Sequence, residues 1–93
     1  MNRRILQSNA FLRDAKRYLK RHPECREPLQ STLRDLETDA FQPRLRTHKL
    51  KGELAQRWSC SAGYDLRVVF RFVEYDGQQA ILLLTIGSHD DVH

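Results

Sequence analysis

The sequence predicts one small α+β domain in which two helices cover one face of a twisted antiparallel sheet. Apolar residues recur at helical spacing in the first half of the chain and alternate with polar residues in the second half. The chain has 93 residues, enough to bury one hydrophobic core and too few for a second. We therefore expect a single domain spanning residues 1–93.

The first two elements are predicted as a short strand over Arg3–Gln7 and a helix that begins after it. Ser8 or Asn9 can cap this helix, because their short polar side chains accept hydrogen bonds from the first turn. One helical face carries the apolar residues Phe11, Leu12, Ala15, Tyr18 and Leu19. Pro23 disfavours helical geometry at the preceding residue, so the helix should end near His22.

A second helix is predicted to follow. Pro28 is tolerated in its first turn, and Leu29, Leu33 and Leu36 recur at helical spacing until Phe41 and Pro43 interrupt the pattern. The two helices are expected to form an antiparallel hairpin.

Three strands are predicted from Arg57 onward. Trp58, Cys60 and Ala62 alternate with polar residues before a turn at Gly63. The next strand carries Leu66, Val68, Phe70 and Phe72 at alternate positions. Asp76-Gly77 favours a type I′ turn, after which Ala80–Ile86 returns as the last strand.

Composition excludes several classes of protein. The longest apolar run, Ala80–Leu84, is too short to cross a membrane, and no apolar leader follows the first arginines, so we expect a cytoplasmic protein. Cys25 and Cys60 match no metal-ligand spacing and are expected to be reduced thiols. The phosphate-binding, esterase and zinc-protease motifs are missing, so we expect neither a metal nor a cofactor.

Charge is divided unevenly along the chain. Residues 1–52 carry 13 Lys and Arg against 6 Asp and Glu, whereas residues 53–93 carry 3 against 6. A basic surface attracts polyanions, which suits nucleic acid or an acidic protein partner. The alternative is an ordinary solvated helix face.

Histidines are the first candidates for acid–base chemistry, since this side chain gains and loses protons near neutrality. His48 precedes the sheet and His89 follows its last strand, whereas His22 is expected to be merely exposed. Cleavage of RNA needs groups that deprotonate a 2′-hydroxyl, hold the phosphate and protonate the leaving oxygen. His48, Asp65, Arg67 and His89 form the candidate set.

One face of the sheet is the predicted site of binding. Arg67 and Arg71 are four residues apart on one strand and therefore project to the same face. In a simple hairpin register we expect this face to carry Val69, Ile81, Leu83 and Thr85 as well. Its apolar part is a candidate seat for a segment of a partner protein.

Several motifs in order carry a family resemblance: His48-x-Leu50-x-Gly52, Trp58-Ser59-Cys60, Tyr64-Asp65-Leu66-Arg67-Val68-Val69-Phe70 and Gly87-Ser88-His89-Asp90-Asp91-Val92. With them the chain resembles the RelE/ParE toxin superfamily, specifically its YafQ-like branch. The resemblance implies the toxin of a bacterial type II toxin–antitoxin pair. Such a toxin is a ribosome-dependent endoribonuclease that cleaves mRNA without metal and is neutralised by a cognate antitoxin.

The resemblance also implies roles for particular residues. His48, Asp65 and His89 match the family's motif positions, with His89 as general acid or base. Arg67 is placed like an arginine of the related RelE pattern, and the hypothesis is that it supplies the positive charge that Thr85 lacks. Four positions depart from the family pattern: Ser61 replaces a histidine, Leu66 an aromatic residue, Thr85 an arginine and His93 a terminal aromatic. RNA or ribosome binding is assigned to Arg44, Arg46, Lys49, Lys51, Arg71 and His93.

Two other functions remain open on the same fold. A ParE-like inhibitor of DNA gyrase shares the arginine-bearing strand, although the histidines argue against it. A non-enzymatic module would use the sheet to accept a helix or strand of a partner.

Overall fold

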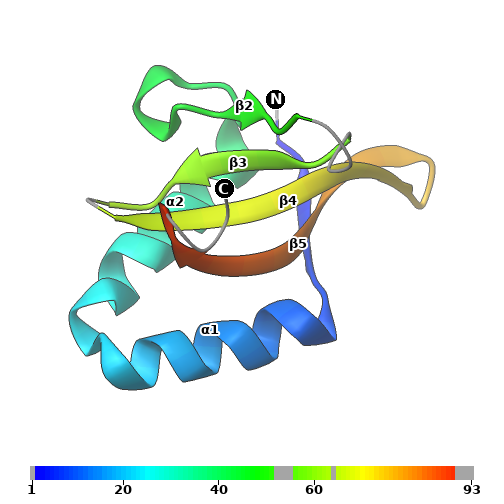
Figure 1. Cartoon of the computed structure of the whole chain (residues 1–93). Helices are drawn as coiled ribbons and strands as arrows, with labels where there is room; N and C mark the ends of the chain where they lie inside the picture. The colour runs from blue at the N-terminus through cyan, green and yellow to red at the C-terminus, as the bar shows by residue number, and fades with distance from the viewer. Residues whose placement is uncertain (1, 52–55, 64, 90–93) are drawn as a thin grey trace.

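The computed structural model describes residues 2–51, 56–63 and 65–89, and it forms two helices packed on a five-stranded sheet (Figure 1). The predicted α+β class is confirmed. In chain order the elements are β1 (Arg4–Gln7), α1 (Asn9–Arg21), the 3-10 turn η1 (Pro23–Cys25), α2 (Arg26–Thr38), a second 3-10 turn η2 (Pro43–Leu45), β2 (His48–Lys49), β3 (Trp58–Ser61), β4 (Leu66–Tyr75) and β5 (Gln78–Ser88).

Helix α1 begins and ends where local chemistry predicts. The Ser8 side chain accepts a hydrogen bond from the Phe11 N–H at 3.0 Å, which satisfies one of the first helical donors. At the other end the His22 N–H donates to the Tyr18 carbonyl before Pro23 starts η1. Phe11 is buried, and Tyr18 packs on the core from the same helical face.

Helix α2 follows η1 directly and carries Pro28 in its first turn, as expected. It buries Leu29, Thr32 and Leu36. The two consecutive helices lie against different parts of the sheet: α1 runs beside β5, and α2 lies behind the strands (Figure 1). No helix within the described residues is long and apolar enough to span a membrane.

The strand order is β1-β5-β4-β3-β2, and the sheet is mixed rather than wholly antiparallel. β1 pairs in parallel with the first half of β5, from Arg4 opposite Ala80 to Gln7 opposite Leu83. The chain then leaves the sheet, with the Ser8 N–H donating to the Leu83 carbonyl, and continues as α1. β1 therefore pairs only with Ala80–Leu83, and helix α1 contacts β5 as the chain continues.

The hairpin between β4 and β5 has the predicted two-residue turn. Asp76 and Gly77 have φ angles of 55° and 77°, the left-handed values that a type I′ turn requires at both positions. Tyr75 pairs with Gln78 across the turn, and this pairing sets the register of both strands.

That register corrects one prediction about the faces of the sheet. Phe70 pairs with Leu83 and Phe72 pairs with Ile81, so Ile81 and Leu83 share the helix-facing side and belong to the core. A bulge beside Val69 then brings Thr85 opposite Val69, as expected. Val69, Ile81 and Leu83 are all buried, so the proposed exposed apolar seat for a partner is wrong.

Candidate functional site

Asp65 and His89 meet where β4 begins and β5 ends. The His89 backbone N–H donates a hydrogen bond to Asp65 Oδ1 at 3.2 Å, and both residues are exposed. Further into the sheet, beyond the Leu66–Ser88 pair, Arg67 pairs with Gly87. Three of the four candidate catalytic residues, separated by up to 24 positions in sequence, therefore gather at one open end of the sheet.

Arg67 is held in place by its neighbours on β3 and β4. Its Nη1 donates to the Leu66 carbonyl at 3.1 Å and lies 3.4 Å from the Ser61 hydroxyl, which itself donates to the Gly63 carbonyl. Ser61 stands where the family carries a histidine, so in this chain that position supports an arginine.

Cys60, the residue before Ser61 on β3, pairs with Val68 and is fully buried. Burial raises the pKa of its thiol to about 12, although the positive charge of Arg67 lowers it. Cys60 is therefore a neutral core residue.

His48 lies on the edge strand β2, farther from the other three residues. It pairs with Ser59, whose partner on β4 is Val69, whereas Arg67 pairs with Ser61. Two strand spacings and a two-residue offset separate His48 from Arg67 by about 12 Å between Cα atoms. His48 is exposed, and its Nδ1 lies 3.0 Å from the Arg46 carbonyl oxygen.

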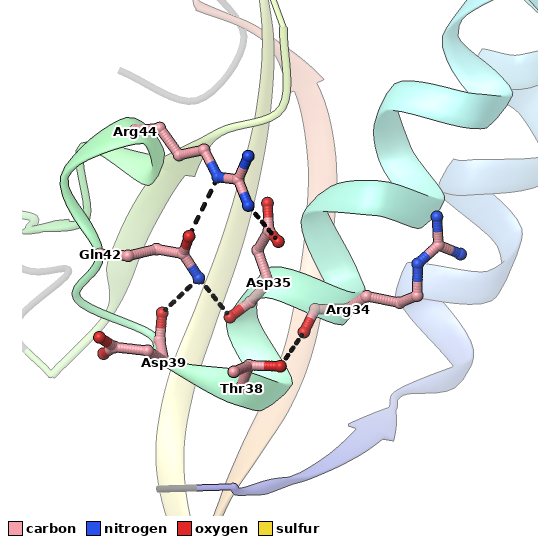
Figure 2. A network of polar contacts seen from close by, with 6 residues as sticks. All are labelled: Arg34, Asp35, Thr38, Asp39, Gln42 and Arg44. Atoms are coloured by element: carbon pink, nitrogen blue, oxygen red, sulfur yellow. Dashed lines mark hydrogen bonds and ion pairs between the residues drawn. The ribbon is translucent and has the colours of Figure 1, made fainter.

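Arg44 is fixed by a polar network at the end of α2 (Figure 2). Its Nη2 contacts Asp35 Oδ1 at 2.9 Å, and its Nε donates to Gln42 Oε1 at 3.0 Å. The Gln42 amide in turn donates to the Asp35 and Asp39 carbonyls, while Thr38 bonds back to Arg34 within the helix. The network orients the Arg44 guanidinium and offsets part of its charge with Asp35.

A cavity of about 590 Å³ gathers three of the predicted cations. Arg44 and Arg46 reach it from η2 and the residue after it, and Arg67 reaches it from β4. The remaining wall comes from α2 and the β3–β4 connection, including Ser31, Asp35, Ser61 and Gly63. Arg46 has a left-handed φ of 52°, which ends η2 and turns the chain toward β2.

Three other predicted binding residues, Lys49, Lys51 and Arg71, do not line this cavity. Lys49 and Lys51 are exposed, and Lys49 follows His48 in β2, so it projects to the opposite face. Arg71 is exposed on the same side of β4 as Arg67. His93, together with the motif residues Gly52 and Tyr64, lies outside the described residues.

Sequence analysis missed the contribution of α1. Arg17, Tyr18, Arg21 and His22 line a second cavity, of about 520 Å³, whose other wall includes Asp65, Gly87 and Ser88. Arg17 and Arg21 are four residues apart, as are Tyr18 and His22. This spacing was the signal available in the sequence, because it places both pairs on one helical surface.

Two of the departures from the family pattern have structural roles here. Thr85 donates to Asp14 Oδ2 at 2.6 Å and so links β5 to α1. Leu66 is 2% exposed and belongs to the core. Neither side chain supplies a charge or an aromatic ring to the open end of the sheet.

No three His, Cys, Asp or Glu side chains in the part of the chain that the structure describes come together as a metal-binding group.

Solved structures of several toxins have the same fold as this chain. The toxin of the E. coli DinJ–YafQ complex superposes with a TM-score of 0.76 at 17% identity, covering 99% of this chain and 98% of that one. A YoeB/ParE toxin from Agrobacterium tumefaciens gives 0.74 at 17% identity, covering 92% and 98%. A conserved Helicobacter pylori protein gives 0.73 at 24% identity over the full length of both chains.

A family model identifies the branch. Residues 3–93 match the model described as bacterial toxin of type II toxin–antitoxin system, YafQ, and the chain belongs to this family. The resemblance drawn from the motifs is thereby confirmed. No curated protein matches the chain in sequence.

Proposed function

We propose that this toxin is a ribosome-dependent endoribonuclease that cleaves translated mRNA at the open end of its sheet. The observation that carries the proposal is the grouping of Asp65, Arg67 and His89, with the Asp65 carboxylate bonded to the backbone of His89. An acid–base group and a phosphate-binding cation at one exposed site suit transesterification of RNA.

The cleavage step uses the 2′-hydroxyl of the RNA as nucleophile. Its oxygen attacks the adjacent phosphorus while the bond from phosphorus to the 5′-oxygen breaks, leaving a 2′,3′-cyclic phosphate and a 5′-hydroxyl. Arg67 stabilises the charge that develops on the phosphorane oxygens. His89 supplies the proton that the leaving 5′-oxygen takes up, and Asp65 positions the His89 backbone.

His48 is the candidate base that takes the proton from the 2′-hydroxyl. Its Nδ1 faces the Arg46 carbonyl, which can only accept, so the neutral ring donates through Nδ1 and carries its lone pair on Nε2. The Cα atoms of His48 and Arg67 are about 12 Å apart, so a phosphodiester bound between the two side chains can contact both.

Arg44 and Arg46 hold RNA backbone beside this site, because they share a cavity with Arg67. Lys49, Lys51, Arg71 and His93 are proposed to contact RNA of the mRNA or the ribosome through charge, and such contacts weaken as salt is added. The protein partner is a cognate antitoxin, as DinJ is seen in complex with the E. coli protein.

The decisive experiment is primer extension on a reporter mRNA in a reconstituted bacterial translation reaction. Cuts that need ribosomes and disappear with His89→Ala are the expected result. His89 is exposed, so the variant should keep its fold, which circular dichroism checks. Unchanged cleavage by a His48→Ala/His89→Ala double variant would overturn the residue assignment. No cleavage under any condition would favour a gyrase inhibitor or a binding module.

A further inference from the structure

Three cavities form a continuous series around the open end of the sheet. The 520 Å³ cavity on α1 shares Tyr18, His22 and Asp65 with a smaller one of about 340 Å³ at the β3–β4 connection. That cavity shares Pro28, Ala62 and Gly63 with the 590 Å³ cavity of the three arginines. In Figure 1 the end of α1, the start of α2 and the ends of β3 and β5 come together here. We refer to the three cavities as the end groove.

Two arginines line the α1 side of the end groove. Arg17 and Arg21 are one helical turn apart, both are exposed, and neither has an ion pair among residues 2–51, 56–63 and 65–89. The two carboxylates in the same cavity already have partners: Asp14 accepts from Thr85, and Asp65 accepts from the His89 N–H. Among the described residues that line this cavity, Arg17 and Arg21 are thus permanently charged cations that can bind an anion.

A pair of rings lies between these arginines and the β3–β4 connection. The rings of Tyr18 and His22 contact each other in a tilted arrangement, with centroids 4.6 Å apart and an interplanar angle of 34°, and His22 is exposed. Burial raises the pKa of Tyr18, and so do the neighbouring Cys25 and the negative charge of Asp65, so the phenol stays neutral beside the candidate site. The exposed ring of His22 offers a flat surface next to Arg17 and Arg21.

We propose that the end groove carries the single-stranded RNA into the candidate active site, with Arg17 and Arg21 on phosphates and the Tyr18–His22 pair under a base. Guanidinium groups combined with stacking rings are the usual means of holding single-stranded RNA. An acidic polypeptide would use the cations but not the ring face. The identity of the ligand as RNA rests on the proposed ribonuclease function.

The test compares two double variants of the same helix. Arg17→Gln/Arg21→Gln removes the groove-lining pair, and Lys16→Gln/Lys20→Gln removes an exposed pair with the same charge and spacing that lines none of the three cavities. Binding is followed by fluorescence anisotropy with a labelled 2′-O-methyl RNA of about 10 nucleotides. This RNA lacks the nucleophile, so cleavage does not enter the measurement.

The expected result is a selective change in salt dependence. Loss of two phosphate contacts reduces the slope of log affinity against log salt by about 1.4 for the arginine variant and leaves the lysine variant near wild type. His22→Ala should lower affinity about fivefold through lost stacking, and His22→Phe should restore it. Equal slopes for both double variants, or no binding by the wild type, overturn the proposal.

Two further outcomes separate this proposal from its rivals. A labelled polyglutamate peptide that loses affinity with the arginine variant, while the RNA does not, would assign the end groove to an acidic protein and overturn the RNA path. If only the arginine variant loses RNA binding and the wild-type protein cuts no mRNA in the presence of ribosomes, the RNA path is supported and the ribonuclease function is rejected.

Discussion

The backbone N–H of His89 donates to Asp65 Oδ1 at 3.2 Å, which ties the residue before β4 to the residue after β5. Since His89 follows the last residue of β5, this bond holds the His89 backbone beside Asp65. The orientation of a proposed acid–base residue thus depends on a carboxylate 24 positions earlier in the chain.

Two substitutions of Asp65 distinguish the effect of its hydrogen bond to His89 from the effect of its negative charge. Asp65→Asn retains the oxygen that accepts from His89, so single-turnover cleavage should fall by less than about tenfold, whereas Asp65→Ala should reduce it by about 100-fold. The measurement is mRNA cleavage with saturating programmed ribosomes. Equal losses in both variants would show that the negative charge of Asp65, rather than its hydrogen bond, serves the reaction.

The link from Thr85 to Asp14 should stabilise the fold. Asp14 has a side chain only 23% exposed, and Thr85→Val removes its 2.6 Å donor while keeping the volume. We expect the free energy of unfolding to fall by about 1.5 kcal/mol, as for other hydrogen bonds to charged groups. Urea unfolding measures it, and Asp14→Ala, which removes the acceptor, completes a double-mutant cycle. Additive effects of the two substitutions would contradict a direct coupling.

The cap of α1 offers a second stability test. Ser8→Ala removes the side-chain acceptor for the Phe11 N–H and should lower the free energy of unfolding by about 1 kcal/mol. Ser8→Asp is the matched control, because a carboxylate can accept the same bond and also interacts favourably with the helix N-terminus. A loss in the Asp variant as large as in the Ala variant would mean that the cap contributes little.

Cys60 should make the fold sensitive to alkaline pH. Its thiol pKa rises from an ordinary value of 9.0 to about 12 in the folded chain. Below pH 9 both states hold the proton, so the full stability is present. Between pH 9 and 12 only the unfolded chain releases it, and stability falls by about 1.4 kcal/mol per pH unit.

The measurement for Cys60 is urea unfolding at pH 8 to 10.5 for the wild type and Cys60→Val. Tyrosines and lysines titrate in both proteins, so the difference between them isolates the thiol. The wild type should lose stability relative to the variant above about pH 9. A constant difference across that range would contradict the buried, protonated thiol.

Local pattern was sufficient for most of the elements. Ser8 and Pro23 marked the ends of α1, and the Asp76-Gly77 pair marked the hairpin turn, because each acts on its immediate neighbours. The motif around Asp65 and His89 was also readable, and the structure brings these two residues together.

Contacts between distant segments were decided only by the tertiary structure. The sequence by itself determined the two helices, the β3–β5 meander and the family motifs, since periodicity and turn chemistry act over a few residues. It did not determine that β1 lies parallel to β5, that Ile81 and Leu83 enter the core, or that Arg17 and His22 face Asp65. Those outcomes depend on register and packing between segments tens of residues apart, such as Asp14 and Thr85, and short-range patterns carry no information about them.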